Sequence, residues 1–155
     1  MEEGFLTPLL YQIAEELPQA LPSIFEDYKL SYLWAYKYDS KMTGINLHGD
    51  DAAINVNFWI TPDEANLDPN TGGLVIWDQE APADWDFFKM NANYDAMRGF
   101  LSEKNAKKTH VPHKQNRAVI FNSDLFHETD TINFKEGYEN RRINVTMLFG
   151  RSRIR

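Results

Sequence analysis

Two hydrophobic periodicities divide the chain. Over residues 6–17 apolar residues recur at helical spacing, and Thr7 followed by a proline suits the first turn of a helix. Over residues 30–38 the period changes to two, with aromatic residues at alternate positions, which is typical of a β-strand. The pattern therefore predicts helical support over residues 1–29, followed by a strand-rich core over residues 30–150.

Further short segments with strand character follow, each bounded by turn-forming residues. They are residues 44–48, 53–61, 73–77, 109–113, 118–121, 125–129 and 143–150. Residues 79–108 interrupt them as a polar insertion, with an amphipathic helix predicted around residues 94–101. The pattern predicts a mainly β fold with flanking helices, a double-stranded β-helix of the jelly-roll and cupin type. An immunoglobulin-type sandwich is the alternative, but it accommodates the helix and the insertion poorly.

Length and hydrophobicity bound the organisation of the chain. With 155 residues, 43% of them hydrophobic, the chain can bury a single core, which predicts one domain over residues 1–155. No stretch approaches the run of about 18 apolar residues that a membrane helix requires, and residues 1–5 lack a signal-peptide pattern. We therefore expect a cytoplasmic protein without a membrane partner. The basic residues 151–155 are interpreted as a solvated tail.

Charge and the lack of cysteine narrow the chemistry. The formal net charge of -7 argues against a nucleic-acid partner, because such affinity comes largely from basic residues that neutralise phosphates. Without cysteine, the chain cannot form disulfides, thiolate metal sites or cysteine nucleophiles. Any metal must therefore be bound by nitrogen and oxygen atoms.

The motif His48-Gly-Asp50 is the strongest candidate for such a site. Alternate side chains of an extended strand share a face, so His48 and Asp50 can reach one ion, whereas Asp51 should face away. His127, in another predicted strand, can supply a third ligand. This triad of two histidines and a carboxylate would leave positions open on an iron ion. An isolated His-Gly-Asp motif is usually structural, so the hypothesis depends on the downstream residues.

The last predicted strand carries a candidate anion-binding arginine. Alternation places Arg142, Asn144 and Thr146 on one face and apolar residues on the other. We expect the polar face to line a cofactor pocket, because each buried donor then has a dicarboxylate or a neighbour as its partner. Asn57, on the polar face of the strand over residues 53–61, joins this lining. Two alternatives stay open, namely Arg141 as the anchor and a surface ion pair for both arginines.

These residues resemble the Fe(II)- and 2-oxoglutarate-dependent dioxygenase superfamily, including its prolyl hydroxylase and phytanoyl-CoA branches. The resemblance covers roughly residues 31–150 and includes the triad, Thr43-Gly44, the segment Thr71-Gly-Gly-Leu74 and the Arg-x-x-x-Thr pattern of residues 142–146. Residues 55–66 and 126–146 are also similar to a bacterial group in which this region can follow tetratricopeptide repeats.

The resemblance implies specific roles. Fe(II) would be bound by the triad, with 2-oxoglutarate and dioxygen as co-substrates and Arg142 as the anchor of the 2-oxoglutarate carboxylate. Tyr36 would place a hydroxyl near that carboxylate, or Tyr38 would do so in another register. The implied reaction couples oxidative decarboxylation of 2-oxoglutarate to hydroxylation of a small molecule or peptide. Asp50, in place of Ala or Gly, argues against the halogenating branch.

Two other functions stay open at the level of sequence. A cupin-like binding module could keep the fold without catalysis and recognise a sugar or peptide through Trp34, Trp59 and Trp77. A metal enzyme could also work with dioxygen or water alone, without 2-oxoglutarate. Metal analysis and a succinate assay would separate these functions.

Overall fold

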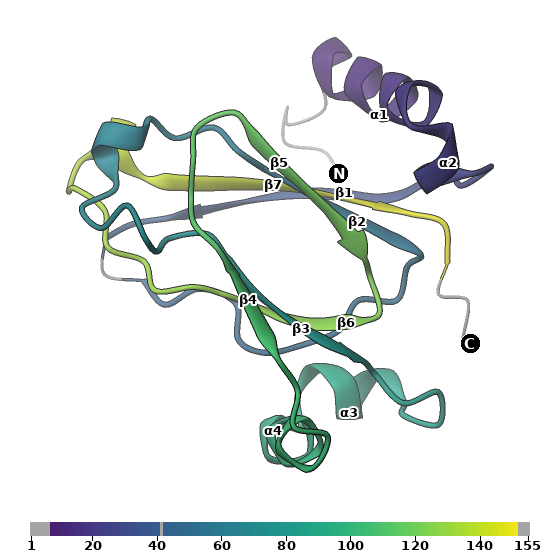
Figure 1. Ribbon diagram of the computed structural model, residues 1–155. Helices are drawn as coiled ribbons and strands as arrows, with labels where there is room; N and C mark the ends of the chain where they lie inside the picture. The colour runs from purple at the N-terminus through teal and green to yellow at the C-terminus, as the bar shows by residue number, and fades with distance from the viewer. Residues whose placement is uncertain (1–6, 41, 152–155) are drawn as a thin grey trace.

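Two antiparallel sheets face each other across the interior of the molecule (Figure 1). The computed structural model describes residues 7–40 and 42–151. In this part of the chain one sheet has the order β1-β7-β2-β5 and the other the order β4-β3-β6. The strands are β1 (Leu30–Tyr38), β2 (Ile54–Trp59), β3 (Leu74–Glu80), β4 (Lys108–Val111), β5 (Arg117–Asn122), β6 (Leu125–Thr129) and β7 (Arg142–Phe149). The mainly β, jelly-roll fold is thus confirmed.

Helices cover the outer side of each sheet (Figure 1). They are α1 (Pro8–Ala20) and α2 (Pro22–Phe25) on the first sheet, and α3 (Phe87–Asn91) and α4 (Tyr94–Glu103) on the second, with short 3-10 turns η1 (Asp63–Ala65) and η2 (Tyr138–Asn140). The side chain of Thr7 accepts a hydrogen bond from the first turn of α1, as its position predicts. Asn93 caps α4 in the same way, and α4 is the helix predicted within the insertion.

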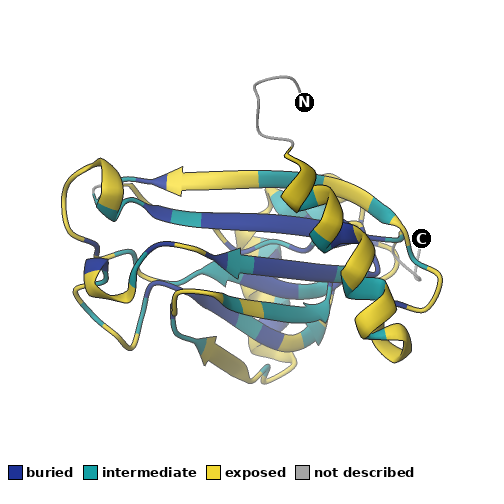
Figure 2. Cartoon of the chain, turned by 90° about the horizontal axis from the view of Figure 1, so that it is seen from above, coloured by how far each residue is buried: buried dark blue, intermediate teal, exposed yellow. Residues whose placement is uncertain are grey.

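The apolar faces of β2 and β7 pack beneath α1. Val56, Met147 and Phe149 form one buried cluster with Ala14 of α1 and Phe25 of α2. The ring of Phe25 meets that of Phe149 edge-on, with centroids 4.8 Å apart. Figure 2 shows the buried strands beneath this helix, whose outer side is exposed. The expected packing of the apolar face is confirmed, which leaves the polar face of these strands turned to the interior.

A second apolar cluster holds the insertion against the other sheet. Its members come from β3, β6, α3, α4 and the neighbouring loops: Leu47, Val75, Trp77, Ala81, Trp85, Met90, Met97, Leu101 and Phe126. Burial of these side chains fixes α3 and α4 on the outer face of the sheet, because apolar area removed from water stabilises that arrangement. The insertion therefore supports the sheet that carries His127.

Residues 44–48 do not form the predicted strand. His48 forms an isolated bridge there with His127 of β6, and the Ile45 carbonyl accepts from the Thr129 amide. The backbone amides of residues 48, 49 and 50 donate in turn to carbonyls of β6, of α3 and of the turn between β5 and β6. Because three successive residues bond to three different segments, the chain cannot continue a single ladder. The strand predicted over residues 44–48 was therefore wrong, but His48 and Asp50 do come together as expected, held by tertiary hydrogen bonds.

The structure also bears on the chain ends and on membrane insertion. Residues 1–6 and, within the predicted basic tail, residues 152–155 lie outside the described residues. In the described part of the chain no helix combines the length and apolar character needed to span a membrane.

Candidate metal centre

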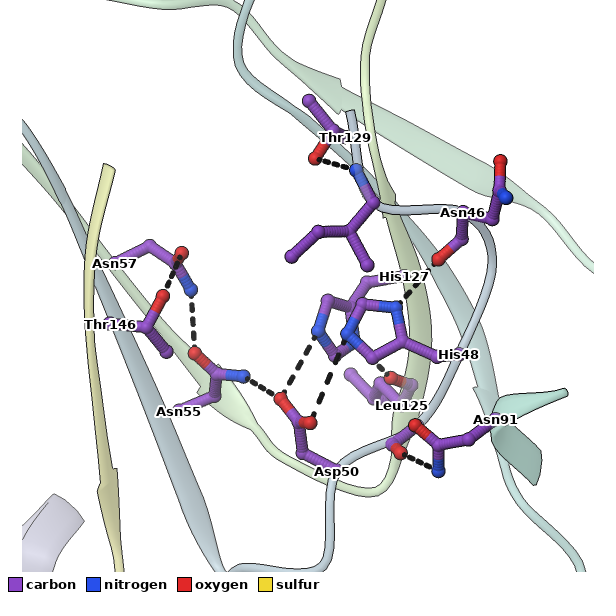
Figure 3. Close-up of polar contacts among 12 residues, drawn as sticks. Asn46, His48, Asp50, Asn55, Asn57, Asn91, Leu125, His127, Thr129 and Thr146 are labelled. Atoms are coloured by element: carbon purple, nitrogen blue, oxygen red, sulfur yellow. Dashed lines mark hydrogen bonds and ion pairs between the residues drawn. The ribbon is translucent and has the colours of Figure 1, made fainter. Parts of the chain in front are cut away.

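The triad residues converge between the two sheets, at the His48–His127 bridge (Figure 3). One candidate ligand atom from each of His48, Asp50 and His127 lies within 4.8 Å of the others. His127 Nε2 is 3.4 Å from Asp50 Oδ2, and His48 Nε2 is 3.8 Å from Asp50 Oδ1. Side chains from a loop and from β6 thus place two ring nitrogens around one carboxylate.

Backbone carbonyls fix the tautomer of both histidines. His48 Nδ1 lies 2.7 Å from the Asn46 carbonyl oxygen, and His127 Nδ1 lies 2.8 Å from that of Leu125. A carbonyl oxygen can only accept, so each Nδ1 must carry the hydrogen. In the neutral form of each ring Nε2 then keeps its lone pair, and both Nε2 atoms lie beside the Asp50 carboxylate. This is the arrangement by which outer partners orient metal-binding histidines.

The charge state of the site suits a divalent cation. Burial and the neighbouring His127 lower the pKa of His48 to about 4, so this ring is neutral at neutral pH. Burial alone would raise the pKa of Asp50, but a hydrogen bond and charge from His127, the charge of His48 when that ring is protonated, and a hydrogen bond from Asn55 bring it below its ordinary value. When both rings are neutral, the carboxylate faces imidazole lone pairs, and this arrangement is favourable only with a proton or a metal cation between them. The nitrogen and oxygen donors fit iron or a similar divalent metal.

Buried amides connect Asp50 to the polar face of the first sheet. Asn55 Nδ2 donates to Asp50 Oδ2 at 2.8 Å, and Asn57 Nδ2 donates to Asn55 Oδ1 at 2.6 Å (Figure 3). Asn57 Oδ1 accepts in turn from Asn144 Nδ2 at 2.8 Å and Thr146 Oγ1 at 3.1 Å. We call Asn55, Asn57, Asn144 and Thr146 the amide relay. Sequence reasoning did not assign Asn55 to the site, although it shares the polar face of its strand with Asn57.

The triad and the relay line one cavity of about 20 Å³. This is room for roughly one water molecule or ion. Its lining is Trp34, Ile45, His48, Asp50, Asn55, Asn57, Leu74, His127, Thr129, Asn144 and Thr146. Trp34 Nε1 and Asn144 Oδ1 are buried there without a hydrogen-bond partner. The wall therefore offers one free donor and one free acceptor.

Arg142 shares the inward face of β7 but lies outside this lining. Its side chain is buried, 1% exposed, and its Nε and Nη2 donate to the carbonyls of Gly72 and Gly73. Burial lowers the pKa of Arg142 to about 10, opposed by the charges of Tyr38 and Asp130, so the guanidinium stays charged at neutral pH. The cation is thus held by backbone oxygens beside a carboxylate.

Tyr36 and Tyr38 stack on each other along β1 but differ in their surroundings. Tyr36 is 40% exposed, whereas Tyr38 is 5% exposed and its ring lies 5.4 Å from the Arg142 guanidinium. Burial raises the pKa of Tyr38, while Arg142 and a hydrogen bond with Thr129 oppose that rise. Because Thr129 lines the cavity, Tyr38 is the tyrosine that connects the cavity with Arg142.

A close contact holds the loop before His48 against β6. The amide of Ile45 donates to Thr129 Oγ1 at 3.0 Å, and a Cβ at Gly44 would come within 2.2 Å of Thr129 Cβ. Only glycine permits this approach. The Thr-Gly pair noted in the sequence thus places the loop that carries the first triad ligand.

Comparison with known proteins gives matches in structure alone. No family model and no curated protein sequence matches the chain. The solved structure of EvdMO1 superposes with a TM-score of 0.63 and 13% identity, covering 96% of this chain and 33% of that protein. Iron-bound HygX from Streptomyces hygroscopicus gives a TM-score of 0.57 and 12% identity, covering 95% of this chain and 69% of HygX. At these identities the likeness shows the fold, and this chain spans a third of EvdMO1.

Proposed function

We propose that this chain is an Fe(II)- and 2-oxoglutarate-dependent oxygenase that hydroxylates a small molecule or peptide. The observation that carries the proposal is the convergence of two Nε2 lone pairs on the carboxylate of Asp50, with both tautomers fixed by backbone carbonyls. Iron-bound HygX has the same fold, which supports iron as the metal.

The protein's own contribution is to bind and orient. When bound, the iron supplies the activation of dioxygen and the oxidation of the substrate. His48, Asp50 and His127 would hold the metal at the cavity that they line together with the amide relay. The neutral state of His48 keeps its lone pair available at neutral pH. Trp34 Nε1 and Asn144 Oδ1 are free to hydrogen-bond a molecule that enters beside the metal.

Arg142 is the proposed partner of the far carboxylate of 2-oxoglutarate. The two carbonyl bonds occupy Nε and Nη2, and Nη1 takes part in neither of them. Burial keeps the Tyr38 hydroxyl protonated, so that it can donate to the same carboxylate. A cavity of about 20 Å³ is smaller than a five-carbon dicarboxylate. Binding therefore requires lining side chains between the triad and Tyr38 to move aside.

The placement of Arg142 also favours a second candidate, a metal enzyme that does not use 2-oxoglutarate. In this case the guanidinium would be structural, since Gly72, Gly73 and nearby Asp130 already compensate its charge. Substrate and dioxygen, or water, would then meet at the metal without a dicarboxylate.

Anaerobic calorimetry tests the proposal and separates the two candidates. Wild-type protein loaded with Fe(II) should bind 2-oxoglutarate, and on exposure to air it should convert it to succinate. Protein that binds Fe(II) but not 2-oxoglutarate would favour the second candidate. Protein that binds no metal would contradict both.

A further inference from the structure

The amide relay has a direction. Asn55 donates to Asp50, Asn57 donates to Asn55, and Asn144 and Thr146 both donate to Asn57. Every hydrogen bond thus has its donor on the side away from the triad. Asn55, Asn57 and Asn144 are each at most 5% exposed, so water does not compete freely for their amide groups.

Asp50 sets this direction. An ionised carboxylate can only accept hydrogen bonds, so Asn55 must turn its Nδ2 towards Asp50 and its Oδ1 towards Asn57. Asn57 must then donate through Nδ2, which leaves its Oδ1 to accept from Asn144 and Thr146. Each amide therefore has one orientation, and the carboxylate has one partner held in place by β2 and β7.

We infer that Asn55 is a positioning residue for the metal, and that it holds the Asp50 carboxylate in the orientation that the metal requires. This inference rests on the metal site of the proposed function. Asp50 lies in a loop, where its amide bonds the Ser123 carbonyl, and Asn55 Nδ2 is the strand donor that bonds its carboxylate. Asn55, in contrast, lies in β2, between β5 and β7. Hydrogen bonds of this kind to a metal-binding carboxylate raise affinity by orienting it.

A purely structural role for the relay predicts a different ranking of its members. Asn57 takes part in three relay hydrogen bonds and Asn55 in two. If the relay only stabilised the fold, Asn57→Ala would be the more damaging change in every measurement. If Asn55 orients Asp50, Asn57→Ala should cost more stability, whereas Asn55→Ala should cost more metal affinity. The two cases predict opposite rankings of metal affinity, so they can be told apart.

The test is a calorimetric titration of Co(II), which accepts the same nitrogen and oxygen ligands, into metal-free protein. Variants Asn55→Ala and Asn57→Ala are compared with wild type, and Asn140→Ala serves as the control, because its amide bonds a backbone carbonyl near η2 instead. Thermal unfolding in the presence of a chelator gives the stability ranking. The visible spectrum of bound Co(II) reports the ligand geometry.

We expect Asn55→Ala to weaken Co(II) binding by roughly 10- to 100-fold and to change the Co(II) spectrum. Asn57→Ala should weaken binding less while unfolding at a lower temperature than Asn55→Ala. If Asn55→Ala does not fold, Asn55→Thr replaces it, since threonine suits a strand but its hydroxyl is too short to replace the amide.

The outcomes separate this inference from the proposed function. Wild-type protein that does not bind Co(II) would contradict the metal site itself. Wild-type binding with unchanged affinity and spectrum in the Asn55 variant would overturn the positioning role alone. Loss of affinity that follows the loss of stability, with Asn57→Ala the weakest binder, would also overturn it in favour of a structural relay.

Discussion

The triad and the surroundings of Arg142 both lie between the two sheets but differ in how their charges are compensated. At the triad, Nε2 of His48 and Nε2 of His127 face the Asp50 carboxylate. With neutral rings, all of these groups are electron-pair donors, and the contacts need a cation. At Arg142 the protein supplies two carbonyl oxygens, an aromatic ring and a nearby carboxylate to one cation. The triad is incomplete without a cation, whereas Arg142 is compensated by the protein itself.

This difference separates two requirements of the proposed oxygenase. A metal would take the place of the proton between the Asp50 carboxylate and a histidine nitrogen, without displacing a protein partner. A dicarboxylate would instead share Arg142 with Gly72, Gly73 and Asp130. Its binding free energy would be smaller, because these partners already compensate part of the charge. Metal binding and co-substrate binding should therefore respond differently to substitution.

The largest expected effect on 2-oxoglutarate binding belongs to Arg142→Ala. Removing the guanidinium should weaken anaerobic 2-oxoglutarate binding by about 2–5 kcal/mol, because a carboxylate would be buried without a partner. Arg141→Ala is the matched control, since Arg141 lies 5.5 Å from the exposed ring of Tyr138 instead. Calorimetry with Fe(II)-loaded protein measures both. If Arg141→Ala shows the loss and Arg142→Ala does not, the anchor has been assigned to the wrong arginine.

Acid should destabilise the metal-free protein through His48. Its pKa is about 4 in the folded protein against 6.5 ordinarily, so the unfolded chain binds the proton first as the pH falls. Stability is therefore lost between pH 6.5 and 4, and the loss approaches roughly 3 kcal/mol. Urea unfolding at several pH values measures it. His48→Gln should remove this part of the dependence and leave that of His113, whose pKa burial and Arg142 also lower to about 4.

An unchanged pH profile in His48→Gln would contradict the neutral, buried state assigned to His48. Urea unfolding at the same pH values with saturating metal tests the metal site. Metal requires the free lone pair of His48, so acid should also weaken metal binding, because protons compete for that nitrogen.

The smallest effect separates the two tyrosines. Tyr38→Phe removes a hydroxyl beside Thr129 and Arg142 and should weaken 2-oxoglutarate binding by about 1 kcal/mol. Tyr36→Phe should leave binding nearly unchanged if Tyr38 is the partner, because Tyr36 is 40% exposed. Anaerobic calorimetry compares them directly. The reverse order would restore the assignment of Tyr36 that the family resemblance implies.

Local patterns carried most of what could be predicted. Strand alternation correctly placed Arg142, Asn144 and Thr146 on the face opposite the apolar cluster, and the capping residue of α1 marked its start. Tyr36 and Tyr38 are two residues apart in one strand and are predicted on the same face, so alternation could not distinguish them. Their difference arises from position along β1, which ends beside Arg142.

Tertiary hydrogen bonds account for what the sequence could not show. Pairing with β6 ends at His48 because the amides of residues 49 and 50 bond to other segments, and no side-chain pattern predicts this. The carbonyls that hold Arg142 come from Gly72 and Gly73, distant in sequence and without a functional group to suggest them. Asn55 was visible as a polar strand residue, but its bond to Asp50 depends on the course of the loop between them.

The central claim is that the triad binds a divalent metal, and anaerobic titration of Fe(II) tests it most directly. Calorimetry on wild-type protein should show one Fe(II) bound per chain, and Asp50→Ala and His127→Ala should each abolish that binding while remaining folded by circular dichroism. Wild-type protein that binds no Fe(II), or variants that bind it as tightly as wild type, would contradict the account.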